Sequence, residues 1–309
     1  IQIPVQIRIV RNLNGFFRLY TEGGADMNLD DYLKAYKIGK KDYQARLMRG
    51  EIPTLQVLDD ILPPKGSCSE VPLGLIQIPI DQIVGTKTDS RSNAFAGNFM
   101  PILNEKSEFA RKWGALSESH INEGIRDPIT AYEYMNKFYV QEGNKRVSVL
   151  KYFDAVSIPG YVTRILPPRT KEKENQIYYE FVDFYALSQI NYIWFSKKGS
   201  FAKLQAAVGK APDEIWSEDD RLTFSSIYSR FTSEYENEGG RKLSITAGDA
   251  FLAFLTVYDY KDICGKTASE LKSLVAKSWE EFNLLEHDQE IDLKMAPNRE
   301  KKPLLNRLL

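Results

Sequence analysis

Apolar and aromatic residues near the middle of the chain follow a pattern that predicts a β-hairpin. Residues 129–134 and 138–140 are rich in β-branched and aromatic side chains, and residues 135–137 between them suit a tight turn. Residues 147–153 then carry apolar side chains at helical spacing, and residues 158–165 predict another strand. The expected local order is therefore hairpin, helix, strand.

Helices are predicted on the N-terminal side of this hairpin. Residues 28–49 have an amphipathic pattern, and residues 54–62 predict a second, short helix before a Pro-Pro break. The apolar stripe of the first helix consists of Leu29, Leu33, Tyr36, Tyr43 and Leu47. A further helix is expected over residues 108–122, closed by Gly124 and followed by Pro128.

The C-terminal part of the chain has a helical pattern throughout. Paired prolines and alternating charges predict a linker over residues 167–175, since such a sequence neither extends a strand nor fills a core. Thr267 and Glu270 have the spacing of a capping box ahead of an apolar i, i+3, i+4 stripe. Another such stripe begins near Thr246. Both stripes predict core positions of a helical domain.

One part of this helical region superficially resembles a helix-turn-helix. Residues 201–208, 212–216 and 219–235 predict short helices around a Gly-Lys-Ala-Pro turn. The candidate recognition helix, residues 213–220, is acidic and would repel DNA phosphates. The pattern therefore does not favour specific DNA binding by this segment.

Composition and charge narrow the classes of function. The chain is 43% hydrophobic and 27% charged, as expected for a globular protein, and no run of about 18 apolar residues predicts a membrane span. The 41 basic and 42 acidic residues give no overall attraction to nucleic acid. Two cysteines and two histidines predict no zinc site and no disulfide framework. We therefore expect a cytoplasmic protein with neither zinc nor haem.

The start of the helix after the hairpin is the most informative candidate site. It consists of Gly143, Asn144, Lys145 and Arg146. A helix start leaves backbone N–H groups without intrahelical partners and adds partial positive charge, so it favours phosphate. Lysine and arginine add full charges, and arginine can hold two phosphate oxygens at once. These residues therefore predict a phosphate-binding site.

Glu142 precedes this box and is the candidate acid of the site. Beside a bound triphosphate, a carboxylate could hold Mg²⁺ or act as a general base. Its alternative role is that of a charge partner for Lys145 or Arg126. The sequence leaves both roles open.

These residues resemble the ParB/sulfiredoxin-like fold family. Residues 116–129 are similar to the family's helix, Gly-Ile turn, proline and strand, and residues 139–146 are similar to its strand and Gly-x-x-Arg phosphate box. Residues 76–83, followed by Arg91, are similar to its opening strand and arginine. The resemblance implies that the box binds a nucleoside triphosphate, CTP or ATP, with Mg²⁺, and that Arg91 and Arg126 approach it.

The chain also departs from the family's pattern. Asn144 stands where sulfiredoxins have their catalytic cysteine, which excludes sulfiredoxin chemistry. No second phosphate motif of the Glu-Asn-x-x-Arg type follows Leu166. Family members that resemble free-serine kinases have an acid at the position of Glu142, but they have histidines at the positions of Asn144 and Lys145.

Together, the pattern and the resemblance predict an α+β fold, namely a ParB/sulfiredoxin-like small mixed-sheet domain with an N-terminal helical segment and a C-terminal all-helical domain. Residues ahead of Met27 are expected to be a non-native leader, because Glu22-Gly23-Gly24 is what a ribosome-binding GGAGG sequence would encode. The expected boundaries are 1–26 for the leader, 27–70 for the helical segment, 71–166 for the mixed-sheet domain, 167–175 for the linker, 176–290 for the helical domain and 291–309 for a tail.

Three functions are compatible with these observations. The first is a ParB-like nucleotide-binding regulatory protein, in some cases associated with DNA. The second is a Mg²⁺-dependent phosphotransferase or NTPase that uses Glu142, and the third is a protein-interaction module that binds no nucleotide. The resemblance further implies a periplasmic-binding-protein-like domain on the same chain beyond Leu309.

Overall fold

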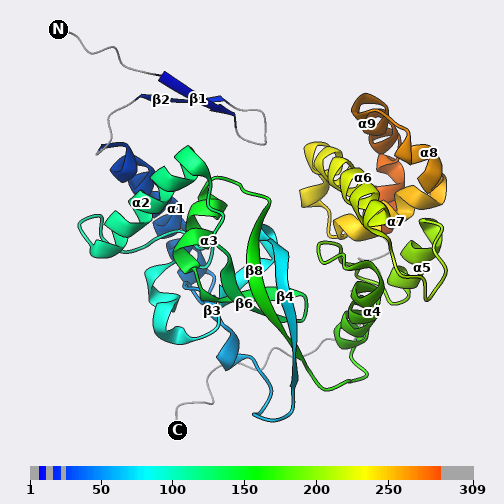
Figure 1. Ribbon diagram of the computed structural model, residues 1–309, viewed down its shortest axis with the longest axis horizontal. Coiled ribbons are helices and arrows are strands. Elements are labelled where there is room, and N and C mark those ends of the chain that lie inside the picture. Colours follow the sequence, from blue (N-terminus) through cyan, green and yellow to red (C-terminus); the bar gives the residue numbers. More distant parts are fainter. Residues whose placement is uncertain (1–6, 12–16, 22–25, 287–309) are drawn as a thin grey trace. The chain divides into compact units, whose positions relative to one another are not determined.

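The computed structural model describes residues 7–11, 17–21 and 26–286. The chain divides into two compact units, Ile1–Pro168 and Arg169–Leu309. The division lies at the start of the linker expected over residues 167–175. Figure 1 shows the sheet in the first unit and helices in the second.

Unit 1 is built on a mixed β-sheet whose described residues form six strands in the order β3-β5-β7-β6-β8-β4. The strands are β3 (Gln56–Val57), β4 (Ser69–Pro79), β5 (Ile83–Thr86), β6 (Ile129–Tyr134), β7 (Lys137–Glu142) and β8 (Ser157–Leu166). β6 and β7 form the expected antiparallel hairpin, and its turn residues Met135 and Asn136 have the positive φ angles, 51° and 59°, that a two-residue hairpin turn requires. β8 then returns parallel to β6. The α+β fold class is therefore confirmed.

The helices of unit 1 are α1 (Asp26–Met48), α2 (Glu108–Glu123) and α3 (Asn144–Tyr152), and they lie together beside the sheet (Figure 1). Short 3-10 helices are η1 (Leu58–Asp60), η2 (Ile80–Gln82) and η3 (Asp89–Ala94). The core between α3 and the sheet includes Ile78, Ile129, Val140, Val147, Leu150 and Ile158. A second cluster joins the three helices through Tyr32, Ala35, Ala110, Trp113 and Val149.

The first helix forms as expected, but its apolar stripe is only partly buried: Leu33, Tyr36 and Tyr43 are half-buried. Leu29 and Leu47 are exposed, whereas Tyr32 and Gly39 are buried. Gly39 lies so close to the following loop that an added Cβ would come within 2.5 Å of the carbonyl oxygen of Pro101. The buried face of α1 therefore combines close backbone approach at Gly39 with the packing of Tyr32 and Ala35 in the helical cluster.

The prediction of a short helix over residues 54–62 is also wrong. This segment forms strand β3 and the single turn η1 instead. β3 pairs in parallel with β5, where the absence of a side chain at Gly85 leaves room for the carbonyl group of Gln56. The expected N-terminal helical segment, residues 27–70, thus contributes a strand to the sheet.

The single strand expected over residues 76–83 is interrupted. β4 ends at Pro79, η2 follows, and β5 begins at Ile83. β4 and β5 consequently lie at different places in the sheet, β4 beside β8 and β5 beside β7. An apolar run gives no signal of such a change of partner.

Unit 2 is helical within its described residues, as expected. Its helices are α4 (Lys173–Ser188), α5 (Ser200–Ala207), α6 (Glu218–Asn237), α7 (Ala247–Val257), α8 (Tyr260–Cys264) and α9 (Ala268–Lys277), with η4 (Gly240–Lys242) and a further helical stretch over 279–286. The capping box expected at Thr267 and Glu270 is present, and Thr246 forms a second one with Asp249. Aromatic rings fill the core, with Phe231 5.0 Å from the ring centre of Phe251.

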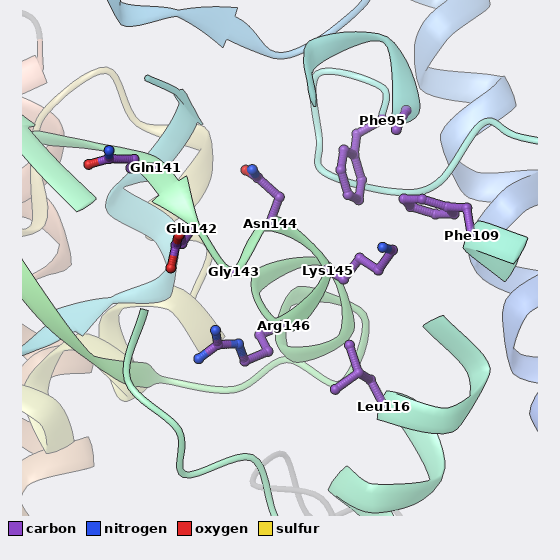
Figure 2. A pocket seen from close by; sticks show the side chains of 10 residues that line it. Phe95, Phe109, Leu116, Gln141, Glu142, Gly143, Asn144, Lys145 and Arg146 are labelled. Carbon is purple, nitrogen blue, oxygen red and sulfur yellow. The ribbon is translucent and has the colours of Figure 1, made fainter. Parts of the chain in front are cut away.

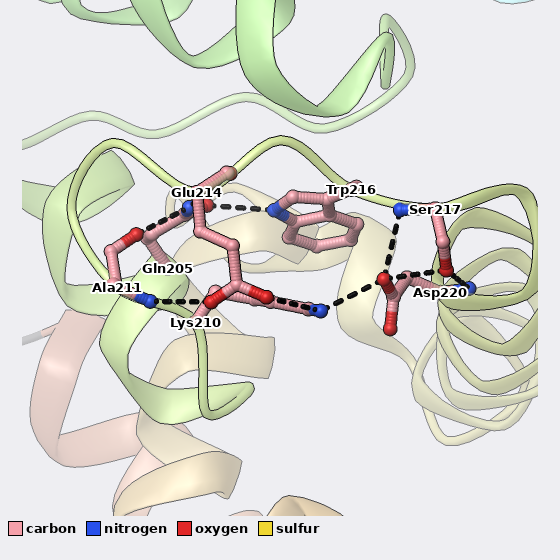
Figure 3. A network of polar contacts seen from close by, with 7 residues as sticks. All are labelled: Gln205, Lys210, Ala211, Glu214, Trp216, Ser217 and Asp220. Carbon is pink, nitrogen blue, oxygen red and sulfur yellow. Dashed lines mark hydrogen bonds and ion pairs between the residues drawn. The ribbon is translucent and has the colours of Figure 1, made fainter.

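The helix expected over residues 212–216 does not form. This segment runs as a turn and an extended stretch between α5 and α6. The side-chain amide of Gln205 donates hydrogen bonds to the carbonyl oxygens of Ala211 (2.8 Å) and Glu214 (3.1 Å), and it accepts one from the indole N–H of Trp216 (2.8 Å), as Figure 3 shows. These bonds satisfy polar groups that a helix would otherwise pair internally.

The acidic residues of this segment form ion pairs within the chain. Lys210 Nζ lies 2.8 Å from both Glu214 Oε1 and Asp220 Oδ2 (Figure 3). The hydrogen bond from Lys210 lowers the pKa of Asp220 to about 2. Because the second helix is missing, the superficial resemblance to a helix-turn-helix does not correspond to such a motif here, and any association with DNA stays a prediction.

Most of the leader expected over residues 1–26 and all of the tail expected over residues 291–309 lie outside the described residues. Within the expected leader, β1 (Ile7–Arg11) and β2 (Phe17–Thr21) pair antiparallel, and the remaining residues before Asp26 are outside the description. The expected tail, residues 291–309, and the domain expected after it are also outside. None of the described helices has the length and apolar character that crossing a membrane requires.

A buried carboxylate ties α1 to the rest of unit 1 and gives the first prediction. Asp31 is 6% exposed and accepts hydrogen bonds from the hydroxyl groups of Tyr152 (3.0 Å) and Ser117 (3.5 Å). We expect Asp31→Ala to lower the free energy of unfolding by about 2 kcal/mol, because buried hydroxyls lose this acceptor. Urea unfolding measures the change.

The neighbouring Asp30 provides the control, because its carboxylate is exposed and pairs only across the surface of α1 with Lys34. Asp30→Ala should change the free energy of unfolding by less than about 0.5 kcal/mol. Equal effects of the two substitutions would show that α1 is not an integral part of unit 1.

Candidate functional site

The residues predicted to bind phosphate lie around a pocket of about 380 Å³ at the start of α3. The pocket is lined by Ala94, Phe95, Phe109, Leu116, Gln141, Glu142, Gly143, Asn144, Lys145 and Arg146. In Figure 2, Glu142 and Arg146 lie on one side of Gly143, and Lys145 extends on the other side toward Phe109. The volume is within the range that small-molecule sites occupy.

Gly143 is required by the sharp change of direction between β7 and α3. Its φ angle is 106°, in the left-handed region that residues with a Cβ rarely adopt. A Cβ at this position would also lie 2.5 Å from Cγ2 of Ile129, a core residue of β6. The glycine therefore lets the strand pass directly into the helix against the sheet.

The first turn of α3 has no capping side chain to accept hydrogen bonds from its backbone N–H groups. Gly143 occupies the N-cap position and has no side chain with which to accept from the first amides. The turn, all of which the structure describes, contains no acidic residue and carries Lys145 and Arg146. Its backbone N–H groups and the partial positive charge of the helix end thus favour an anion at this place.

Asn144 is the least expected feature of the pocket. Its side chain is only 7% exposed, and its Oδ1 atom is buried without a hydrogen-bond partner. In Figure 2 its amide extends from the start of α3 toward the region between Gln141 and Phe95. A buried polar atom that lacks a partner costs about 1–3 kcal/mol, so such atoms call for an explanation.

The two cationic side chains of the box differ in their surroundings. Lys145 Nζ lies 4.9 Å from the ring centre of Phe109, which is a cation–π distance. Arg146 donates through Nη1 to the carbonyl oxygens of Asp127 (2.9 Å) and Pro128 (2.6 Å). Arg146 therefore fixes the segment that leads into β6, a role that the sequence did not predict.

Glu142 is the last residue of β7 and lies in the pocket wall with an exposed side chain. No ion pair between Glu142 and Lys145 or Arg126 occurs among the described contacts. Groups of three or more His, Cys, Asp or Glu side chains that could hold a metal are absent from the part of the chain that the structure describes.

The two remaining predicted residues are not part of the pocket wall. Arg126 lies with an exposed side chain in the segment between α2 and β6, and it is not among the lining residues. The backbone of Arg91 lies in η3, but its side chain is outside what the structure describes. The prediction that these arginines approach the site stays untested.

Sequence reasoning missed the apolar side of the pocket. Ala94 and Phe95 come from η3 and the residue after it, and Phe109 and Leu116 come from α2. Phe109 and Leu116 belong to the apolar pattern of their helix and are half-buried, so their spacing predicts core. Only the fold brings them to the start of α3.

Comparisons with models of known protein families and with curated proteins find no match for this chain. The resemblance to the ParB/sulfiredoxin-like fold family therefore stays a prediction that rests on the quoted residues. The function proposed below therefore rests on the geometry of the pocket.

The conformation of Gly143 gives the second prediction. Gly143→Ala should lower the free energy of unfolding by about 1 kcal/mol for the left-handed φ and by a further 1–3 kcal/mol for the contact with Ile129. Gly199→Ala is a matched control, because Gly199 is the left-handed N-cap residue of α5, with a φ of 77° and open space around an added Cβ. Chemical unfolding of both variants tests this, and equal losses would contradict the packing argument.

His120 gives a prediction on pH. Its ring packs 5.1 Å from the ring centre of Phe153, and Nδ1 accepts a hydrogen bond from the backbone N–H of Ile125 (3.4 Å). Burial lowers the pKa of His120 below its usual value of 6.5. The folded state thus favours the neutral ring, whose contribution is complete above about pH 6.5 and is lost as the pH falls through the lower, folded pKa.

We therefore expect the melting temperature to fall between pH 7.5 and pH 5, and to fall less in His120→Gln, which cannot take up this proton. Differential scanning fluorimetry across this range measures the difference. Parallel pH profiles for the two proteins would contradict the role assigned to His120.

Proposed function

We propose that this chain is a nucleotide-binding regulatory protein that holds phosphate groups at the start of α3. The observation that carries the proposal is the buried Oδ1 of Asn144, which lacks a partner in a pocket of about 380 Å³ beside the free end of a helix. A group that costs stability when unpaired is expected where a ligand supplies the missing partner. Because Oδ1 only accepts, that partner would be a Mg²⁺ ion bound to the phosphates rather than a phosphate oxygen.

The charge of the site supports an anionic ligand. The backbone N–H groups of the first turn and the side chain of Lys145 provide donors and positive charge, without an acidic residue in that turn. The pocket also has an apolar wall formed by Phe95 and Phe109. A ligand with phosphate groups and a less polar part satisfies both sides of the pocket.

Magnesium fits the same group of residues. Mg²⁺ takes carboxylate and amide oxygens together with substrate phosphates, and both Glu142 and Asn144 Oδ1 are oxygen donors of this pocket. A bound Mg²⁺ would neutralise phosphate charge, and the two side chains would hold it directly or through its water molecules. Their proximity to the helix start is consistent with a Mg²⁺-bound triphosphate.

Arg146 provides a way in which binding would change the protein. Its Nη1 hydrogen bonds go to the neutral carbonyl groups of Asp127 and Pro128. A phosphate oxygen carries negative charge that a carbonyl oxygen lacks and can be held bidentately, so a phosphate within reach would compete for this guanidinium. Transfer of Arg146 to the ligand would release the segment ahead of β6, and this would be the regulatory response.

A phosphotransferase or NTPase activity is the second candidate. It is favoured by one observation, the position of Glu142 in the wall of the same pocket. In this case Glu142→Gln would remove turnover and leave nucleotide binding nearly unchanged.

Association with DNA, a downstream periplasmic-binding-protein-like domain and a cytoplasmic location are further parts of the proposal, and they rest on the sequence alone.

Asn144→Ala separates a role in binding from a role in stability. The full chain is titrated by calorimetry with CTP, ATP and GTP plus Mg²⁺, and with inorganic tripolyphosphate plus Mg²⁺. We expect the substitution to weaken binding of the Mg²⁺-phosphate complexes about tenfold or more, because it removes an oxygen ligand for Mg²⁺, and tenfold corresponds to about 1.4 kcal/mol. The melting temperature should stay the same or rise, since a buried unpaired atom is removed.

Asn136→Gly is the matched control. The Oδ1 atom of Asn136 is also buried without a partner, but this residue lies in the β6–β7 turn and not in the pocket wall. Glycine keeps the positive φ of the turn, and binding should not change. If neither tripolyphosphate nor any of the nucleotides binds to the unaltered protein, the proposed function is wrong and the interaction module remains.

A further inference from the structure

A second pocket adjoins the phosphate site and has a different chemical character. It has a volume of about 410 Å³ and is lined by Ser90, Asn93, Ala94, Leu103, Glu108, Phe109, Lys112 and Lys145. Ala94, Phe109 and Lys145 line both pockets. A ligand that extends past Lys145 and Phe109 would therefore occupy both.

The second pocket contains the carboxylate of Glu108 together with two lysines, Lys112 and Lys145. Glu108 lies in its wall at the first position of α2, where its carboxylate is 2.6 Å from Lys112 Nζ. The hydrogen bond from Lys112 lowers the pKa of Glu108, so the carboxylate stays ionised at neutral pH. An ionised carboxylate accepts hydrogen bonds, so it favours ligand groups that donate.

The other lining groups suit a flat, partly polar group. Phe109 provides a ring whose orientation is set by packing, because its centre lies 5.2 Å from that of Phe95 in an edge-on arrangement. Ser90 and Asn93 add a hydroxyl and an amide to the same wall. Aromatic faces and such polar groups are the means by which proteins hold nucleobases and sugars.

We propose that the second pocket binds the nucleoside part of the nucleotide whose phosphates lie at the start of α3. Phe109 forms the wall beside the nucleoside, and Glu108 accepts a hydrogen bond from it. This inference rests on the proposed function and adds where the nucleoside lies and what selects it. Lys145, which lines both pockets, then lies where the phosphates and the nucleoside meet.

The donor that Glu108 recognises is either an amino group of the base or a hydroxyl group of the ribose. Paired nucleotides distinguish the two sources. CTP and UTP differ in the amino group, and CTP and dCTP differ in the 2′-hydroxyl. Loss of affinity for UTP alone assigns the donor to the base, and loss for dCTP alone assigns it to the sugar.

The test compares Mg²⁺-nucleotide with Mg²⁺-tripolyphosphate on the full chain by calorimetry. The unaltered protein should bind its best nucleotide at least about tenfold more tightly than tripolyphosphate, which corresponds to one added charge-assisted hydrogen bond. Glu108→Gln should remove most of this difference and leave the affinity for tripolyphosphate unchanged. Phe109→Leu should likewise lower the affinity for nucleotide more than the affinity for tripolyphosphate.

The control is Glu123→Gln, which changes an exposed carboxylate at the far end of α2 and should affect neither ligand. Glu108 is exposed on the surface of α2, so Glu108→Gln is expected to fold even if Phe109→Leu does not. If tripolyphosphate and nucleotide bind equally well to the unaltered protein, or if Glu108→Gln affects both equally or neither, this inference is wrong while phosphate binding stands. If neither ligand binds, the proposed function itself is wrong.

Discussion

The turn at Gly143 is the constraint on which the candidate site depends. β7 runs into α3 without a connecting loop, and this is sterically allowed because Gly143 adopts a φ of 106° against Ile129. The same turn removes the side chain that would normally cap the helix, so the first amides of α3 face the pocket without an internal acceptor. One steric requirement of the fold thus produces the chemical property that a phosphate site needs.

The supporting structure holds this turn from several directions. α3 packs on the sheet through its apolar side, and α1 and α2 cover it through the cluster around Trp113, whose indole N–H donates to Ser148 Oγ (2.8 Å). Arg146 holds the segment ahead of β6 through two carbonyl groups. The pocket therefore combines a rigid helix start with a neighbouring segment held by a side chain that a phosphate could attract, as a ligand-controlled change of contacts requires.

The sequence predicted those parts of the fold whose signals are local. The hairpin, α2 with its Gly124 end, α3 and the capping box of α9 all depend on residues within a few positions of each other, and all are confirmed. The prediction errors occur where contacts with residues distant in the sequence determine the local structure. β3 pairs with β5 beside Gly85, and the non-helical residues 212–216 contact Gln205 through the carbonyl group of Glu214 and the indole N–H of Trp216.

The same distinction applies to the site. Residues 142–146 are adjacent in the chain and were predicted together, and the structure places all of them around one pocket. Phe95 and Phe109 reach this pocket through packing of η3 and α2, and their sequence pattern indicates only core. The unpaired state of Asn144 likewise has no sequence signal, because asparagine at a helix start is common and its burial depends on the surrounding chain.

The most direct test of the central claim is the amide NMR spectrum of the ¹⁵N-labelled protein during titration with Mg²⁺-tripolyphosphate. Phosphate held at the start of α3 should shift the backbone amide signals of Asn144, Lys145 and Arg146, with the side-chain amide signals of Asn144, in a saturable manner. Saturable shifts confined to other parts of the chain, or the absence of any shift, would contradict the assignment of the phosphate site to this helix start.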